Sequence, residues 1–150
     1  MTVETIAPVL RSVTIECSRE HAFRVFTEQI GEWWPLETYS IYGTDVAAAY
    51  FEPGDGGRIV ERSKAGEESN WGEILIWEPP TRVAFTWHPG HKPDESSTEV
   101  ELRFVAVDDG TRVDLEHRGW EALAEPEEAR KSYDQGWPGV LARFADLATA

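Results

Sequence analysis

The last quarter of the chain, residues 125–150, constrains the fold most. Its apolar residues are spaced three and four apart, which places them on one face of a helix. They are Ala129, Tyr133, Trp137, Val140, Leu141, Phe144 and Leu147. Pro126 suits the first helical turn, and Pro138 predicts a kink near residues 135–137 because it removes one helical hydrogen bond. A helix this amphipathic needs an apolar surface to pack against.

That surface is expected to be a sheet, because the remainder of the chain reads mostly as alternating strands. Strands are predicted over residues 8–16, 46–51, 58–62, 71–77, 83–87, 98–107 and 111–118. A helix capped by Ser18 and a short helix or turn ending at Pro35 follow the first strand. Strands linked by short turns form antiparallel sheets. The sequence thus predicts a single α+β domain over residues 1–150, in which a curved antiparallel sheet of about seven strands packs on one long helix.

The charge of the chain argues against several classes of partner. With 28 acidic and 14 basic residues, its net charge is -14 at pH 7, which repels nucleic-acid phosphates and anionic lipid headgroups. No secretory signal or run of about 18 apolar residues is present, so a cytoplasmic protein is expected. The lone Cys17 excludes an internal disulfide and a thiolate metal cluster. No metal and no cofactor is predicted.

Several short motifs follow one another along nearly the whole chain. They are residues 17–26 (CSREHAFRVF), 33–35 (WWP), 53–54 (PG), 56–57 (GG), 71–74 (WGEI), 78–83 (EPPTRV), Tyr133 and 136–137 (GW). In these motifs the chain resembles the helix-grip superfamily (SRPBCC) of START-like and birch-pollen-allergen-like domains, and within it the bacterial homologues of the activator of heat-shock-protein-90 ATPase. The resemblance implies the helix-grip fold. Members bind apolar ligands, cyclise polyketides or assist a chaperone, so the fold alone does not select a function.

Strand alternation predicts which side chains face the long helix. Pairing the last two strands about residues 108–110 places Leu102 opposite His117 and Phe104 opposite Leu115. Pairing the two strands before them places Ile74 opposite Phe85, with Gly72 leaving room for the Trp87 indole. The predicted inward set is Val100, Leu102, Phe104, Val113, Leu115, His117, Gly72, Ile74, Ile76, Val83, Phe85 and Trp87.

Eight residues are candidate ligand contacts between the sheet and the long helix. They are Trp34, Phe85, Trp87, Leu102, Phe104, His117, Tyr133 and Trp137. Apolar walls with a few polar groups are typical of a small-molecule pocket. The alternative is that these side chains only fill the core. A cavity of roughly 300 Å³ or more under the helix favours a pocket.

Three further residues are predicted to point outward as an apolar stripe: Trp71, Leu75 and Trp77. Exposed contiguous apolar surface often marks a contact with a protein partner or a second copy of the chain. The alternative is that a loop or the N-terminal arm covers this stripe.

Catalytic chemistry has weak support in the sequence. His117 is the one histidine predicted to face inward, either as an ordinary buried neutral imidazole or as a ligand-orienting or acid–base group. His88 and His91, with Asp94 and Glu95, lie in a loop that has no frame to fix a metal site. No pair of inward carboxylates is predicted, and no catalytic residue is assigned.

Three functions remain open on these grounds. A non-enzymatic domain that binds a small apolar or aromatic molecule is favoured, with Tyr133 and His117 orienting the ligand. A chaperone-linked protein-interaction module using the outward stripe is the second. A cyclase-like or hydrolase-like enzyme using His117 is the third.

Overall fold

A computed structural model describes residues 6–35, 42–87, 97–123 and 125–149. Its strands are β1 (Val9–Ile15), β2 (Val46–Phe51), β3 (Arg58–Ser63), β4 (Glu68–Glu78), β5 (Arg82–Trp87), β6 (Thr98–Val107) and β7 (Gly110–Arg118). Its helices are α1 (Arg19–Glu28), α2 (Ile30–Trp33) and α4 (Pro126–Ala148). Two short 3₁₀ turns, η1 (Gly43–Asp45) and η2 (Trp120–Ala122), precede β2 and α4.

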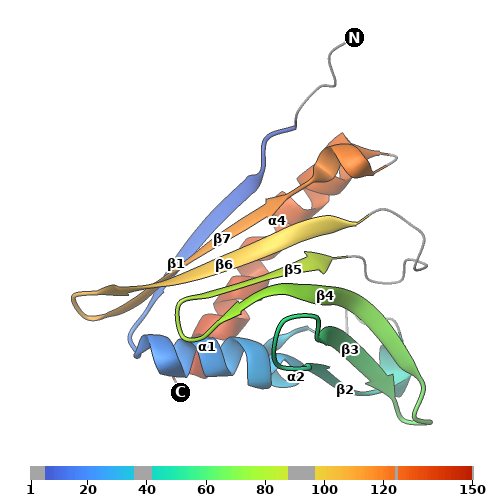
Figure 1. The fold of residues 1–150 in the computed structure, drawn as a ribbon, viewed down its shortest axis with the longest axis horizontal. Helices are drawn as coiled ribbons and strands as arrows, with labels where there is room; N and C mark the ends of the chain where they lie inside the picture. The colour runs from blue at the N-terminus through green and yellow to red at the C-terminus, as the bar shows by residue number, and fades with distance from the viewer. Residues whose placement is uncertain (1–5, 36–41, 88–96, 124, 150) are drawn as a thin grey trace.

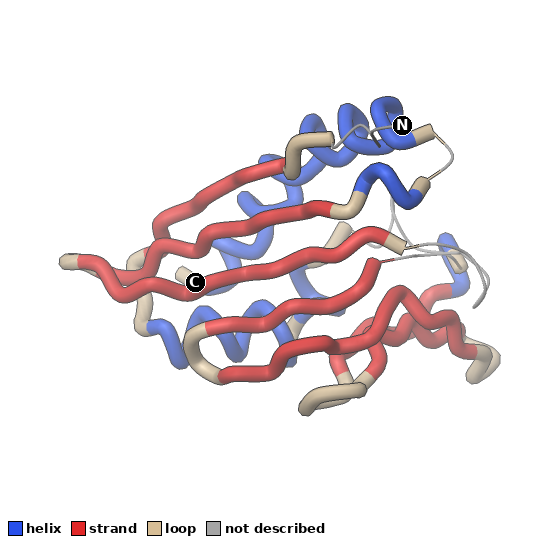
Figure 2. The backbone as a smooth tube through the Cα atoms, turned by 45° about the horizontal axis from the view of Figure 1, so that its top comes forward, coloured by secondary structure: helices blue, strands red, loops and turns tan. Residues whose placement is uncertain are grey.

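The strands form one antiparallel sheet of seven, in the order β1-β7-β6-β5-β4-β3-β2. α4 runs across one face of this sheet, with α1 beside its C-terminal end (Figure 1). The helices gather on that same side of the strands (Figure 2). The predicted α+β helix-grip architecture is therefore confirmed, and the apolar face of α4 meets the sheet as its spacing required.

α1 and α2 together set the position of Trp34. Ser18 Oγ accepts a hydrogen bond from His21 N at 3.2 Å, which fixes the start of α1. The indole Nε1 of Trp33 donates to Val25 O at 3.0 Å and so ties α2 to α1. Trp34 N donates to Ile30 O at 2.9 Å and ends α2. The side chain of Trp34 is thereby held between the helices and the sheet.

α4 continues through Pro138, which lies inside it. Pro138 has no N–H for the carbonyl oxygen of Asp134, four residues earlier. That oxygen instead accepts from Arg11 Nη2 at 3.0 Å, and the same nitrogen binds Asp134 Oδ1 at 2.7 Å. A side chain of β1 thus supplies the hydrogen bond that the proline removes. The helix continues without a break from Pro126 to Ala148, through the residues where the sequence predicts a kink.

The β6–β7 hairpin turns in two residues, because Val107 already pairs with Gly110. Leu102 therefore lies opposite Leu115, and Val100 opposite His117. The predicted pairs are wrong by two residues, since the prediction used a three-residue turn. A shift of two leaves every side chain on its predicted face. The inward residues of both strands are accordingly all buried.

Trp71 lies at a bulge in β4. Gly72 pairs with Ile59, but the next pair joins Asn70 to Val60, so Trp71 has no residue opposite it. An extra residue of this kind changes the alternation of faces along the strand. Trp71 is 1% exposed, and its indole Nε1 donates to a Glu61 oxygen at 3.1 Å. The prediction that Trp71 points outward is wrong for this reason.

A second register shift in β4 turns Trp77 as well. Ile74 pairs with Phe85, but Ile76 pairs with Ala84, so Leu75 is the extra residue. Trp77 is half-buried, and its ring centroid lies 5.2 Å from that of Phe23 on α1. Of the predicted partner stripe Trp71, Leu75 and Trp77, only Leu75 is largely exposed, at 45%. The stripe does not exist as a continuous apolar surface.

Gly72 allows a close approach of two backbones. A Cβ atom at this position would lie 1.8 Å from Thr86 O. The glycine therefore makes room for the carbonyl group of β5, whereas the sequence predicts that it makes room for the Trp87 indole. No side chain fits here unless one strand moves.

Gly72→Ala is expected to lower the free energy of unfolding by about 1–3 kcal/mol, because β4 and β5 must separate locally. Urea unfolding followed by circular dichroism measures this loss. Gly136→Ala is the matched control, since a Cβ at Gly136 meets nothing within 4 Å and alanine favours a helix. Equal stability of Gly72→Ala and the wild type would contradict the backbone contact.

Candidate ligand-binding pocket

A pocket of about 260 Å³ lies beside α4, close to the end of β5 and the residue after α2. It is lined by Trp34, Trp87, Ser132, Tyr133, Gly136, Trp137 and Val140. Trp137 and Val140 are buried and Ser132 is exposed, so the pocket reaches from the core to the surface. Its volume is close to the lower end of the range usual for small-molecule sites, about 300–1,000 Å³. The side chains beside α4 therefore leave a small pocket and do not fill the core completely.

α4 contributes two adjacent rows of residues to this pocket. Ser132, Gly136 and Val140 are spaced four apart, as are Tyr133 and Trp137, so both rows face the same way. Gly136 lines the pocket together with the aromatic side chains, and a Cβ atom there would meet nothing within 4 Å. The missing side chain of Gly136 therefore leaves open space beside the aromatic walls.

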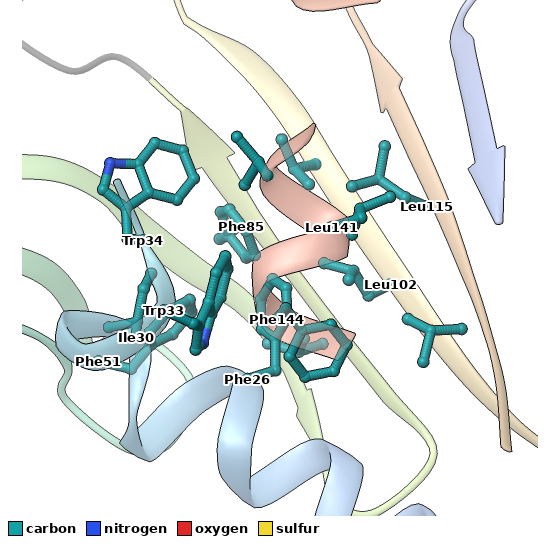
Figure 3. Packing of buried hydrophobic residues seen from close by; sticks show 14 of the residues in the cluster. Phe26, Ile30, Trp33, Trp34, Phe51, Phe85, Leu102, Leu115, Leu141 and Phe144 are labelled. Atoms are coloured by element: carbon teal, nitrogen blue, oxygen red, sulfur yellow. The ribbon is translucent and has the colours of Figure 1, made fainter. Parts of the chain in front are cut away.

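The aromatic lining residues form one wall of the pocket, with Trp34 at its centre. They are Trp34, Trp87, Tyr133 and Trp137. The ring centroid of Trp34 lies 5.5 Å from that of Trp87, 5.5 Å from that of Trp71 and 6.2 Å from that of Trp137. The rings are tilted or edge-on to one another, an arrangement that favours attraction between aromatic quadrupoles. In Figure 3, Trp34 stands at the edge of the packed core, while Phe26, Trp33 and Phe144 crowd together below it.

A hydrogen-bonded network supports the wall from behind. The indole Nε1 of Trp137 donates to His117 Nδ1 at 3.0 Å. An indole can only donate, so the proton of the neutral imidazole is on Nε2. His117 Nε2 donates in turn to Thr98 Oγ1 at 2.7 Å, and Thr98 Oγ1 donates to Trp87 O at 3.2 Å. The network connects α4 to β7, β6 and β5.

His117 supports this pocket but does not line it. The side chain is completely buried, and burial lowers the pKa of the imidazole to about 3. Both ring nitrogens are already hydrogen-bonded, and the ring lies 4.1 Å from Trp120 and 4.8 Å from Tyr133 between centroids. The imidazole is therefore neutral at physiological pH and is held as a structural group. The predicted direct contact with a ligand has no geometric support.

Tyr133 brings a hydroxyl group to the pocket. Its oxygen accepts a hydrogen bond from Trp87 Nε1 at 3.0 Å. Burial raises the pKa of the phenol, so the hydroxyl stays protonated. Among the residues that the structure describes, the phenolic hydrogen has no acceptor. Tyr133 therefore presents a donor at the wall.

Four of the eight predicted contacts line the pocket, namely Trp34, Trp87, Tyr133 and Trp137. Three others, Phe85, Leu102 and Phe104, are at most 2% exposed and belong to the packed core, where Figure 3 labels the first two. The sequence analysis missed Ser132, Gly136 and Val140. Their four-residue spacing along the same face as Tyr133 and Trp137 was the available signal.

Two other kinds of site find no support in the described segments. No group of three or more His, Cys, Asp or Glu residues in the described segments is placed to share a metal ion. The predicted loop residues His88, His91, Asp94 and Glu95 lie outside these segments. No described helix combines the length and the apolar character needed to cross a bilayer.

Comparison with protein families gives one match, which covers most of the chain. Residues 16–149 match the model of the Activator of Hsp90 ATPase homolog 1-like protein family. No curated protein matches the sequence.

Three solved structures illustrate the range of similar proteins. The anthrahydroquino-γ-pyrone synthase Txn09 is 38% identical, with 95% of this chain and 97% of that chain covered and a TM-score of 0.65. The self-sacrificing resistance protein CalC from Micromonospora echinospora is 29% identical, with coverage of 95% and 94% and a TM-score of 0.67. The Aha1 dimer from Colwellia psychrerythraea is 16% identical, with coverage of 94% and 95% and a TM-score of 0.65, and shows likeness of fold alone.

Proposed function

The chain belongs to the Activator of Hsp90 ATPase homolog 1-like family, and we propose that this member binds a planar aromatic small molecule in the pocket beside α4. The observation that carries the proposal is the lining itself. Three indole rings and one phenol line a cavity of about 260 Å³ that reaches the surface at Ser132. Such a lining offers large flat contact area and few polar groups, as small-molecule sites do.

One similar protein with a described activity supports an aromatic ligand. Txn09, 38% identical over nearly its whole length, is described as a synthase of an anthrahydroquino-γ-pyrone. A product of that name is a fused, flat, oxygenated aromatic system. The walls formed by Trp34, Trp87 and Trp137 suit the same class of molecule, because aromatic faces attract one another in offset and edge-on arrangements.

A binding role is favoured over acid–base catalysis by the chemistry of the lining. Tyr133 is the one titratable residue in the lining that the structure describes, and burial raises the pKa of its phenol. His117 is neutral, fully hydrogen-bonded and outside the lining. Ring closure on an aromatic substrate, suggested by Txn09, is a second candidate, in which Tyr133 would donate a hydrogen bond to a substrate oxygen.

The structure does not contain the exposed apolar stripe on which the protein-interaction alternative was based. Trp71 is buried and Trp77 half-buried at the two bulges of β4, so Leu75 is the one residue of the predicted stripe that is largely exposed. A single exposed apolar residue is normal for a soluble protein and marks no interface. A homodimer or a chaperone contact would need a different surface.

The pocket proposal predicts a specific effect of filling the space beside Gly136. Gly136→Leu is expected to weaken binding of anthraquinone-2-sulfonate about tenfold or more, since its side chain would occupy the pocket. Isothermal titration calorimetry at pH 7 measures the dissociation constant of this probe.

Gly139→Leu provides the matched control for that experiment. Gly139 lies on the same helix, and a Cβ there also meets nothing within 4 Å, but it does not line the pocket. Its variant is expected to bind like the wild type. Failure of the wild type to bind flat aromatic probes, or equal weakening by both substitutions, would refute the proposed pocket.

A further inference from the structure

We propose that the pocket prefers aromatic ligands that carry a hydrogen-bond acceptor oxygen, such as a quinone or pyrone carbonyl, and that Tyr133 determines this preference. The inference rests on the proposed aromatic ligand and specifies its chemical class. It follows from the direction of each hydrogen bond around the pocket.

Each polar hydrogen in the network of Trp137, His117 and Thr98 already has an acceptor. An indole nitrogen carries a hydrogen and accepts nothing, so Trp137 Nε1 must donate to His117 Nδ1. The hydrogen on His117 Nε2 then goes to Thr98 Oγ1, and the Thr98 hydroxyl hydrogen goes to the carbonyl oxygen of Trp87. No polar hydrogen of this network remains for a ligand.

The same reasoning leaves a donor on Tyr133. Trp87 Nε1 can only donate, so at 3.0 Å it occupies a lone pair of the Tyr133 oxygen. The phenolic hydrogen must then point elsewhere, and no acceptor for it occurs in the described part of the chain. Because the phenol is largely buried and stays protonated, the wall offers a donor whose acceptor has to come from the ligand or from water.

An acceptor oxygen on the ligand satisfies this donor, and a hydrocarbon does not. A ligand without an oxygen at this point displaces water from the hydroxyl and leaves its hydrogen without a partner, which is costly in an apolar site. Sites built to hydrogen-bond a ligand group discriminate strongly against analogues that lack it. The Trp87–Tyr133 pair thus gives a largely apolar pocket a hydrogen-bond donor that favours a ligand with a carbonyl group.

A pair of matched probes tests this inference. Anthraquinone-2-sulfonate and anthracene-2-sulfonate share the three-ring frame and the anionic group, and differ in the two carbonyl oxygens. By calorimetry, the wild type is expected to bind the quinone about fivefold to tenfold more tightly, the effect of one neutral hydrogen bond. Tyr133→Phe is expected to weaken the quinone by that factor and the hydrocarbon by less than about twofold.

Ser132→Ala is the control, because Ser132 lines the same pocket at its exposed rim. It is expected to keep the preference for the quinone, and the ratio of the two dissociation constants cancels any general loss of pocket shape. If the wild type binds both probes and Tyr133→Phe weakens both alike, or weakens neither, the inference is wrong while the pocket stands. If the wild type binds neither probe, both proposals fall.

Discussion

Trp137→Ala is expected to lower the free energy of unfolding by about 3–5 kcal/mol, the usual cost of truncating a buried tryptophan. Trp137 is 3% exposed and contacts the rings of Trp34 and Tyr133. Its removal also takes the donor from His117 Nδ1, which lies in the core. An acceptor left unpaired there adds a desolvation penalty to the cavity. Urea unfolding at pH 7, followed by far-ultraviolet circular dichroism, measures the loss.

Trp137→Phe separates the two contributions. Phenylalanine keeps most of the ring volume but has no N–H, so its cost of about 1–3 kcal/mol reports chiefly the lost hydrogen bond to His117. The alanine variant should be clearly less stable than the phenylalanine variant. A loss below about 1 kcal/mol for Trp137→Ala would show that this side chain is not packed as described.

Acidification from pH 7 to pH 5 is expected to cost the wild type about 2 kcal/mol of stability, from 1.36 kcal/mol per pH unit below the unfolded pKa. Burial lowers the pKa of His117 to about 3 in the folded protein, whereas histidine in an unfolded chain titrates near 6.5. The unfolded chain therefore binds a proton that the folded protein excludes. The contribution of His117 is complete above about pH 6.5 and is lost progressively as the pH falls toward 3.

This interval lies above the one in which the carboxylates respond. Burial acts to raise the pKa of Glu101, but hydrogen bonds from Arg118, Arg103 and Arg82 outweigh it, so the pKa is lowered. A lowered carboxyl pKa makes stability fall only below the unfolded value, about 4.3 for glutamate. A loss already seen between pH 7 and pH 5 therefore belongs mainly to histidine.

Two variants assign the loss to one histidine. His117→Gln keeps a donor and an acceptor but does not titrate, so its stability should change little between pH 7 and pH 5. His21→Gln changes a histidine whose Nε2 lies 3.0 Å from Ala148 O, and because it leaves His117 in place, the loss assigned to His117 should remain in this variant. Unfolding free energies that are equal at both pH values in the wild type would contradict a buried neutral imidazole.

The sequence predicted the architecture well because its signals are local and redundant. The spacing on α4, the Ser18 cap and the strand alternation each specify one element, and the order of elements then leaves few folds. The wrong turn length before Gly110 did not change which face of the sheet each side chain was predicted to occupy. It shifted the β6–β7 register by two residues, and the period of a strand is also two.

The faces of β4 were not predictable in the same way. Each of its two register shifts inserts one residue, and one residue is half of a strand period. Trp71 and Trp77 therefore changed sides, while Leu75 kept its predicted face. Gly72, beside the first shift, is a residue of the kind that often marks a bulge, but the position of each shift is set by pairing with β3 and β5.

The pocket was predicted only in part, since its shape depends on a missing side chain. The aromatic residues Trp34, Trp87, Tyr133 and Trp137 are conspicuous in the sequence, and all four line it. Gly136 gives no chemical signal, although its place among them opens the space. The directions of the hydrogen bonds, which make Tyr133 a donor, follow only from distances between atoms.

The pairing of β1 with β7 has a consequence for how the chain is made. Of the seven strands of this sheet, β1 is synthesised first, yet its neighbour in the sheet is β7, which is synthesised last. Until β7 has been synthesised, Val9 and Ile15, both buried in the finished protein, stay in contact with water. Closing so long a loop slows folding. The sheet is therefore complete only after its seventh strand has been synthesised, and β1 needs protection from other chains until then.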